Sequence, residues 1–369
     1  MISHSSAPLV HIINSLDAGG AERMLSQIAS HQACTGQDVI VVCLKNRGHF
    51  GEAITAAGVE LHCLEMPNKS FFRALLEIRS LIRTRKPAFV MSWLYHADLM
   101  GTLACLMTGH KDFAWNLRCS DIDFSKYSPS THLVVRTLAL LSRFPREILS
   151  NNRAGIEAHK KLGYTPPRWT YMPNGFDLES FYPDKALGQK VRDEFSIPED
   201  APIIGTVARN DPQKDYPTLL KAARTVLAQN PAARFLLIGA DTDKLDLTEA
   251  ERTKIICTGR RKDINALLNA MDTFILTSAY GEGFPNVLGE ALAVGLPCIS
   301  TDVGDARDLL AGHGTVIPKQ DAETLSSNIL GLLEELQAQK LKSPERRQYI
   351  VENFDIRKIC GRYSELMLS

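Results

Sequence analysis

The sequence lacks the features that mark membrane-spanning and nucleic-acid-binding proteins. No apolar run approaches the roughly 18 to 20 residues that a spanning helix needs, and no basic-then-apolar signal is visible at the N-terminus. The 42 Lys and Arg residues balance the 42 Asp and Glu residues, so no overall field would attract nucleic acid or anionic lipid. We therefore expect a cytoplasmic protein with no nucleic-acid partner.

Cysteine is present, but in no functional pattern. The eight cysteines are scattered, with no CxxC pair and no Cys/His cluster at the spacing of zinc ligands. Cys43, Cys63 and Cys298 lie inside apolar runs, where a free thiol packs as a small hydrophobic side chain. The sequence therefore predicts reduced cysteines and no zinc site.

The length of 369 residues favours two domains, at roughly 150 residues per domain. Short β-rich runs alternate with helical patterns, which predicts parallel sheets covered by helices on both faces. The alternation stops near 172–175 and restarts at 202–207. We predict an α/β protein with doubly wound, Rossmann-like domains at 1–178 and 185–353, and with 354–369 packed back on the first. Ligands bind outside the carboxyl ends of such strands, so the domains should face each other across a cleft that holds the site.

The strongest local pattern is EGFPNVLGE, which runs from Glu282 to Glu290 after the predicted strand 273–278. Pro285 suits the first position of a helix that ends at Gly295. The N–H groups and dipole of a helix start bind anions, and each glutamate can accept hydrogen bonds from hydroxyls beside the anion. Taken alone, two glutamates at this spacing are more simply explained by capping and surface charge. The other segments favour the ligand site.

A basic pair, Arg209 and Lys214, follows the first strand of the second predicted domain. Such a pair is often solvated, but here it belongs to the same sheet edge as the Glu282 loop. It can neutralise a pyrophosphate and stabilise the charge that develops as the pyrophosphate leaves. We identify no acidic cluster that suits a Mg²⁺-bridged diphosphate, so we predict no metal and no other cofactor.

The first domain offers two weaker signals at the same kind of edge. Gly19 and Gly20 follow the opening strand and allow backbone to approach a ligand, although a plain turn is an equal alternative. The full GxGxxG fingerprint is missing, which argues against an NAD-linked enzyme. His96 ends another strand and can hydrogen-bond a sugar hydroxyl or carry a proton, although an isolated histidine is more often structural. Nearby Asp98 either orients it or charges the first helical turn.

These segments, in this order, resemble the family 4 glycosyltransferases, which are retaining enzymes with the two-domain GT-B fold. The resemblance covers nearly the whole chain. The matching segments are 16–23, 93–101, 171–183, the Arg209 and Lys214 pair, 282–290 and 295–304. One departure is Gly304-Asp305, where many relatives have a second glycine, and it leaves the function of that loop open.

The resemblance implies a function for each matching segment. Glu282 would contact donor-sugar hydroxyls, Glu290 the ribose, and the backbone of 284–288 the phosphates, with His96 near the transferred sugar. Gly19 and Gly20 would approach the diphosphate, and Thr258 to Arg261 would border the base. The predicted catalytic residues are Arg209, Lys214, Glu282 and His96, and the predicted donor-binding residues are Gly19, Gly20, Thr258, Arg260, Arg261, Gly283, Phe284, Pro285, Asn286, Val287, Leu288 and Glu290.

The resemblance also implies the reaction. We expect transfer of a hexose or N-acetylhexosamine from a nucleoside-diphosphate sugar, with UDP as the commonest carrier in the family, to a glycan or lipid-linked acceptor of a bacterial envelope polysaccharide. No carboxylate is nominated as a nucleophile, so we favour front-face substitution in which the leaving phosphate takes the acceptor's proton. Two alternatives are an enzyme like UDP-N-acetylglucosamine 2-epimerase and a non-catalytic protein that binds nucleotide or glycan.

The acceptor side is the least defined part of the sequence. Residues 69–86 contain six basic residues and one acid, with apolar residues at helical spacing. This pattern predicts a covering helix, and the alternative is peripheral contact with the inner face of the cytoplasmic membrane. Arg118, Asp121 and Asp123 lie on an acceptor-side loop and can bind sugar hydroxyls, or they can form an ordinary solvated loop.

Overall fold

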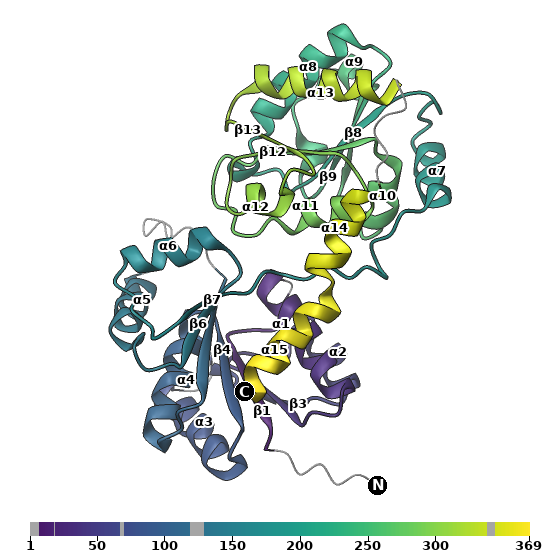
Figure 1. The fold of residues 1–369 in the computed structure, drawn as a ribbon. Coiled ribbons are helices and arrows are strands. Elements are labelled where there is room, and N and C mark those ends of the chain that lie inside the picture. The colour runs from purple at the N-terminus through teal and green to yellow at the C-terminus, as the bar shows by residue number, and fades with distance from the viewer. Residues whose placement is uncertain (1–6, 18, 67–69, 119–128, 338–343) are drawn as a thin grey trace. The chain divides into compact units, whose positions relative to one another are not determined.

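The protein forms two compact α/β units, which are each described by themselves (Figure 1). The computed structural model describes residues 7–17, 19–66, 70–118, 129–337 and 344–369. The first unit contains 1–175 and 356–369, and the second contains 176–355. Each unit is a parallel sheet with helices on both faces, as the alternating sequence pattern predicts.

The sheet of the first unit has seven parallel strands in the order β3-β2-β1-β4-β5-β6-β7. The strands are β1 Leu9–Ile13, β2 Val39–Cys43, β3 Glu60–Cys63, β4 Phe89–Trp93, β5 Phe113–Leu117, β6 Glu147–Ser150 and β7 Trp169–Tyr171. The direction of winding reverses between β1 and β4. Ligands of open α/β sheets bind at this kind of switch point, outside the carboxyl ends of the strands.

Two apolar layers cover this sheet. Helices α3, α4 and α5 pack on one face, and α1, α2 and α15 pack on the other. The helices of the first unit are α1 Gly20–Cys34, α2 Gly51–Ala56, α3 Phe71–Arg85, α4 Tyr95–Thr108, α5 Pro129–Leu141, α6 Arg153–Lys161 and α15 Ile356–Leu368. The C-terminal helix α15 therefore packs on the first unit, although the chain reaches it only after passing through the second.

The sheet of the second unit has six parallel strands in the order β10-β9-β8-β11-β12-β13. The strands are β8 Ile203–Val207, β9 Arg234–Ile238, β10 Ile255–Gly259, β11 Thr273–Leu276, β12 Cys298–Thr301 and β13 Thr315–Ile317. The helices are α7 Lys185–Glu194, η3 Pro212–Lys214, α8 Tyr216–Gln229, η4 Thr242–Lys244, α9 Glu249–Arg252, α10 Ile264–Ala270, α11 Asn286–Ala293, α12 Ala306–Leu310, α13 Ala322–Gln337 and α14 Glu345–Phe354. The switch point of this sheet lies between β8 and β11.

The boundary between the units differs slightly from the predicted one. It lies at Gly175/Phe176 rather than after residue 178, because Phe176 and Leu178 pack in the apolar core of the second unit. The return crossing lies at Asp355/Ile356, and the Phe176 N–H donates to the Phe354 carbonyl oxygen at 2.7 Å. The chain thus leaves and re-enters the first unit through two adjacent segments.

None of the helices in the described ranges is both long enough and apolar enough to cross a membrane. Helix α3 covers the predicted basic amphipathic segment, and Leu75, Ile78 and Ile82 are buried as the covering-helix interpretation predicts. Phe71, which belongs to the same predicted stripe, is 37% exposed.

Candidate active site

The predicted catalytic residues of the second unit lie at its switch point. Arg209 and Lys214 are in the loop between β8 and α8, and Glu282 is in the loop between β11 and α11. Because β8 and β11 are neighbours in the sheet, the two loops leave the same edge side by side. The fold thus brings together residues that are more than 60 positions apart in sequence.

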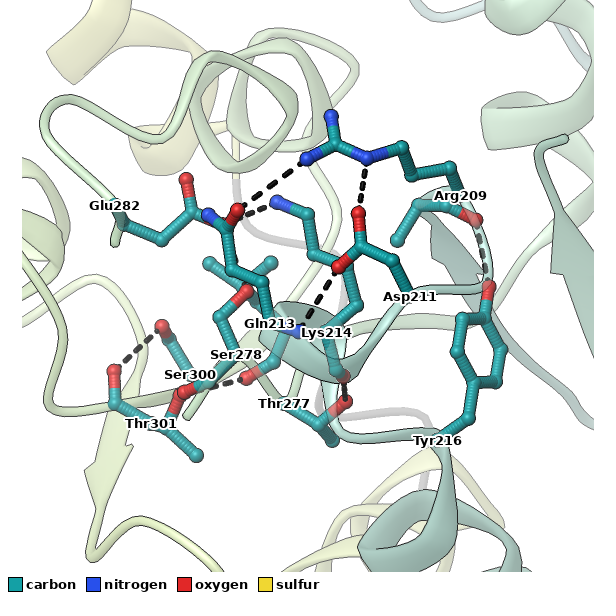
Figure 2. A network of polar contacts seen from close by, with 12 residues as sticks. Arg209, Asp211, Gln213, Lys214, Tyr216, Thr277, Ser278, Glu282, Ser300 and Thr301 are labelled. Atoms are coloured by element: carbon teal, nitrogen blue, oxygen red, sulfur yellow. Dashed lines mark hydrogen bonds and ion pairs between the residues drawn. The ribbon is translucent and has the colours of Figure 1, made fainter. Parts of the chain in front are cut away.

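Lys214 and Glu282 form an ion pair, in which the Lys214 Nζ contacts Glu282 Oε1 (Figure 2). Their side chains are only 15% and 12% exposed. The Ser278 hydroxyl donates to the same Glu282 oxygen at 2.7 Å, and the Thr277 hydroxyl donates to the Lys214 carbonyl oxygen at 2.8 Å. The predicted cation and the predicted sugar-binding carboxylate are therefore held against each other in a largely desolvated position.

Arg209 has a different environment. Its side chain is 62% exposed, and its Nε donates to the Asp211 carboxylate (Figure 2). Its Nη2 donates more weakly to Gln213 Oε1 at 3.3 Å. The other Asp211 oxygen accepts the Gln213 N–H at 2.9 Å and so caps the start of η3. Both predicted diphosphate-binding cations are therefore paired with carboxylates of their own unit.

Helix α11 starts beside this pair. It begins at Asn286, with Pro285 as its N-cap rather than its first residue. Phe284 is buried and packs on Phe176, with ring centroids 6.1 Å apart. The Leu288 N–H donates to the Pro285 carbonyl oxygen at 3.0 Å, so this amide is occupied within the first turn. The amides of the preceding residues remain the better candidates for an anion.

The loop after β12 closes against the start of the Glu282 segment. Gly304 has a φ of +50°, and a Cβ at this position would overlap the carbonyl oxygens of Gly283 and Glu282. The Asp305 N–H donates to the Gly283 oxygen at 2.9 Å. The Gly304-Asp305 pair, where the sequence departs from many relatives, therefore supports the backbone of the loop that carries Glu282.

Glu290 lies on α11 and is only 8% exposed. A glutamate at this depth is uncommon as ordinary surface charge, since carboxylates are almost never buried without partners. The structure therefore removes surface charge as an explanation for Glu290. Its assignment to the ribose stays a prediction.

The residues predicted to border the base divide into two kinds. Thr258 lies in β10 and Arg260 is exposed just after it. The Arg261 guanidinium, in contrast, pairs with Glu194 at 2.5 Å and with Asp263 at 2.6 Å, and these partners raise its pKa. Arg261 thus ties β10 to α7, a structural contact that its position in the sequence motif did not reveal.

The switch point of the first unit carries the glycine loop and the histidine. Gly19 is the N-cap of α1, Gly20 is its first residue, and His96 is the second residue of α4. Asn14 Oδ1 accepts the Ala97 N–H at 2.9 Å and so links the loops after β1 and β4. His96 is exposed, and partial desolvation together with the charge of Lys45 lowers its pKa. Its imidazole is therefore neutral at pH 7.

Asp98 lies in the first turn of α4, and its hydrogen-bond partner is Ser92 rather than His96. Its side chain is fully buried, and Oδ1 accepts the Ser92 hydroxyl at 2.6 Å. Burial raises the pKa of Asp98 well above its usual value, which favours the neutral acid. Asp98 thus lies in the first turn of α4, but its side chain points into the core rather than to the surface.

Arg118 has a structural function within the first unit. Its guanidinium donates to Asn174 Oδ1 and to the Tyr363 hydroxyl, the latter at 2.7 Å, and lies 4.8 Å from the centre of the Trp93 ring. These contacts join β5, the segment before the boundary and helix α15. Asp121 and Asp123, the other predicted acceptor residues, lie outside the described residues.

Three residues of the site were missed in the sequence. Thr277, Ser278 and Asp211 hold Lys214, Glu282 and Arg209. A signal was present for the first two, because paired hydroxyl residues end an apolar strand directly before the glutamate loop. Across the described ranges, no three His, Cys, Asp or Glu side chains gather so that they could hold a metal ion.

Two family models match the chain, one for each half. The model described as Glycosyltransferase Family 4 matches residues 18–180, and the model described as Glycosyl transferases group 1 matches residues 201–335. Together they cover both switch points. This agrees with the resemblance carried by the sequence motifs.

Similar proteins and structures agree with the family models. The chain is 22% identical to the UDP-Gal:alpha-D-GlcNAc-diphosphoundecaprenol alpha-1,3-galactosyltransferase of Escherichia coli, over 99% of this chain and 98% of the relative. It is 24% identical to the capsular polysaccharide biosynthesis glycosyltransferase CapM of Staphylococcus aureus, over 72% of each. The crystal structure of Anabaena HepE in complex with UDP superposes with a TM-score of 0.80 at 19% identity, over 97% of this chain and 98% of HepE. The predicted GT-B fold is confirmed.

Proposed function

This chain belongs to the family 4 glycosyltransferases, and we propose that it transfers a hexose or N-acetylhexosamine from a UDP-sugar, with retention, to a lipid-linked glycan. The observation that carries the proposal is the Lys214–Glu282 pair at the β8/β11 switch point, beside the start of α11. One site then supplies a cation and helix amides for a diphosphate, and a carboxylate for sugar hydroxyls.

The relatives support the choice of substrates. The full-length Escherichia coli relative is named for a UDP-sugar donor and a diphosphoundecaprenol-linked acceptor, and HepE was crystallised with UDP. The CapM relative is named for capsular polysaccharide biosynthesis. We infer a UDP-sugar donor and a polyprenyl-diphosphate-linked acceptor for this chain, within the synthesis of a bacterial envelope polysaccharide.

Donor binding would exchange the partners of both cations. The diphosphate oxygens would replace Asp211 on Arg209 and Glu282 on Lys214, and the start of α11 would add its amides and its dipole. Glu282, relieved of Lys214, could then accept hydrogen bonds from donor-sugar hydroxyls. As the bond between the sugar and the diphosphate breaks, the cations stabilise the departing charge. The leaving phosphate takes the acceptor's proton on the same face, which retains the configuration.

We propose that these cations make the reaction independent of a divalent metal. Arg209 and Lys214 supply the positive charge that Mg²⁺ supplies to a diphosphate elsewhere. The prediction is that EDTA leaves turnover unchanged and that Mg²⁺ does not raise the affinity for UDP. A loss of activity in EDTA that Mg²⁺ restores would contradict it.

We also propose peripheral contact with the inner face of the cytoplasmic membrane through the α3–α5 layer of the first unit. Eight of the eleven strongly exposed large apolar side chains in the described ranges belong to this layer and the turn after it: Phe71, Phe72, Leu76, Leu106, Met107, Leu133, Leu140 and Phe144. Basic side chains such as Arg79, Arg136 and Arg143 lie among them in sequence. Apolar and basic side chains together suit an anionic lipid surface.

The donor proposal is tested by titrating the protein with UDP, GDP, ADP and their common sugar conjugates while its melting temperature is followed. A ligand that binds only the folded state raises the melting temperature with its concentration. We expect UDP and one UDP-sugar to stabilise the protein, Glu290→Ala to weaken this effect, and Glu323→Ala, an exposed glutamate on α13, to leave it unchanged. Stabilisation by no nucleotide would overturn the proposal.

A further inference from the structure

Two buried hydroxyl side chains directly follow strand β11, at the start of the loop that carries Glu282. Thr277 is 4% exposed and Ser278 is fully buried. Neither belongs to the residues that the family resemblance assigned to the donor. Their side chains nevertheless point at the two members of the ion pair, as Figure 2 shows.

Each hydroxyl holds one member of the pair. Thr277 Oγ1 donates to the main-chain oxygen of Lys214 at 2.8 Å and so fixes the backbone from which the lysine extends. Ser278 Oγ donates to Glu282 Oε1 at 2.7 Å, the oxygen that Lys214 also contacts. The serine therefore acts on the carboxylate itself, whereas the threonine acts only on backbone.

Ser278 is itself held in place on both sides. Its carbonyl oxygen accepts the Thr301 hydroxyl from the end of β12 at 2.7 Å. The next residue, Ala279, donates its N–H to the Gln213 carbonyl oxygen at 2.8 Å. The serine backbone is thus tied to β12 and to η3, and its hydroxyl is a donor in a fixed position.

This geometry matters when the partners of Lys214 change. If a diphosphate draws the lysine away, Glu282 loses its ion-pair partner on Oε1, but the hydrogen bond from Ser278 to that oxygen remains. A carboxylate that keeps a fixed donor also keeps its orientation, and orientation of binding groups is a large part of enzymatic rate enhancement.

We propose that Ser278 is a positioning residue, which holds the Glu282 carboxylate in place for the donor sugar while Lys214 binds the diphosphate. The inference rests on the proposed function, because it assumes that Glu282 contacts the sugar. It predicts that replacing the serine impairs binding and turnover of the UDP-sugar but leaves binding of UDP alone unaffected.

The experiment compares Ser278→Ala and Ser278→Cys with Ser300→Ala. Ser300 is a matched control, because it is also fully buried at the end of a neighbouring strand and its hydroxyl donates only to the Thr301 carbonyl oxygen, at 2.9 Å. Two quantities are measured for each variant: the affinity for UDP by calorimetry, and kcat/KM for release of UDP from the UDP-sugar that the wild-type protein prefers among UDP-glucose, UDP-galactose and UDP-N-acetylglucosamine.

We expect Ser278→Ala to lower kcat/KM by about tenfold or more, as for the loss of a hydrogen bond to a charged group, while its UDP affinity stays within about twofold of wild type. Ser278→Cys keeps a weaker donor of similar size, so its kcat/KM should lie between those of Ser278→Ala and wild type. The kcat/KM of Ser300→Ala should resemble that of wild type. Equal losses in Ser278→Ala and Ser300→Ala, or a parallel loss of UDP affinity, would show general loosening of the loop and overturn the inference.

The two proposals fail in different ways. A wild-type protein that binds no nucleoside diphosphate overturns the proposed function and this inference with it. A wild-type protein that binds UDP and turns over a UDP-sugar, with Ser278→Ala equally active, overturns the inference alone.

Discussion

The switch points of the two sheets have the same topology but carry different chemistry. In the second unit, the loops after β8 and β11 hold Lys214 and Glu282 as a largely desolvated ion pair supported by buried hydroxyls. In the first unit, the loops after β1 and β4 present glycine backbone and one exposed, neutral histidine, His96. The same strand order therefore carries a largely desolvated ion pair at one switch point and an exposed, neutral histidine at the other, because the loops, not the sheets, set the chemistry.

The largest effect should come from the charged switch point. Lys214→Met removes the cation proposed to stabilise the leaving diphosphate, and we expect kcat/KM to fall about 10² to 10³-fold, the range for removal of one preorganised group that stabilises developing charge. Lys221→Met, on the exposed side of α8, should stay near wild type. Release of UDP from the donor measures both, and similar rates for the two variants would remove Lys214 from the mechanism.

The next effect is a difference between the two units in how their stability depends on pH. Nine of the ten histidines precede residue 160, and burial lowers the pKa of His11 and of His159 to about 4. Between about pH 6.5 and pH 4 the unfolded chain binds a proton at each of these sites and the folded chain does not. Each site therefore contributes stability that is present above pH 6.5 and lost as the pH falls to about 4, at about 3 kcal/mol per site.

Replacing His159 isolates one of these contributions. We expect the free energy of unfolding of the first unit to fall by about 3 kcal/mol less between pH 7 and pH 4 in His159→Gln than in wild type. Asp98, whose raised pKa acts in the opposite direction, is common to both proteins and cancels. Hydrogen exchange of first-unit amides in urea measures the difference, and His313→Gln in the second unit should show none. An unchanged pH dependence in His159→Gln would contradict the prediction.

A smaller effect should follow removal of the Arg118 clamp. Arg118→Met removes the guanidinium from the Trp93 ring and takes from Asn174 and Tyr363 the donor that they share. We expect the first unit to lose about 2 kcal/mol and α15 to exchange its amides faster, while UDP affinity is unchanged. Arg146→Met is the control, because its bond to Ser369 is exposed. Loss of acceptor turnover without loss of stability would instead support Arg118 as an acceptor residue.

The smallest expected effect concerns the switch point of the first unit. If His96 only hydrogen-bonds a sugar hydroxyl, His96→Gln should lower kcat/KM by about tenfold or less and leave UDP affinity unchanged. His110→Gln, at a partly exposed histidine just after α4, provides the comparison. A loss above about 100-fold would be typical of proton transfer and would make the two switch points more alike than we propose.

Much of the fold could be predicted because the apolar pattern is strong where strands are central. The apolar runs at 9–14, 38–44, 88–93, 202–207 and 234–238 coincide with β1, β2, β4, β8 and β9, since a strand covered on both faces has a continuous apolar sequence. The strands β5, β6, β7 and β13 were not among the predicted ones. Strands β6, β7 and β13 have only three or four residues each, and runs of that length carry no reliable period. Strand β5 has five buried residues, and its length does not explain why it was missed.

The candidate site, like the fold, was predictable where it depends on residues close together in the chain. Motif spacing located Arg209, Lys214, Glu282 and Glu290, because helix starts and strand ends can be read locally. It could not show that Lys214 and Glu282 contact each other, because the pairing of β8 with β11 is a long-range property of the sheet. Nor could it separate Arg261, which is paired with two carboxylates, from the exposed Arg260 beside it.

The sequence by itself determined the class of fold and the family resemblance, and it located the loops predicted to carry the chemistry, because each of these depends on residues close together in the chain. The tertiary structure alone decided which charges are paired, which side chains are buried and which hydroxyls hold them, because a partner such as Ser278 for Glu282 or Tyr363 for Arg118 is defined only when distant elements pack. A buried polar side chain needs a specific partner, because a group removed from water must form its hydrogen bonds within the protein.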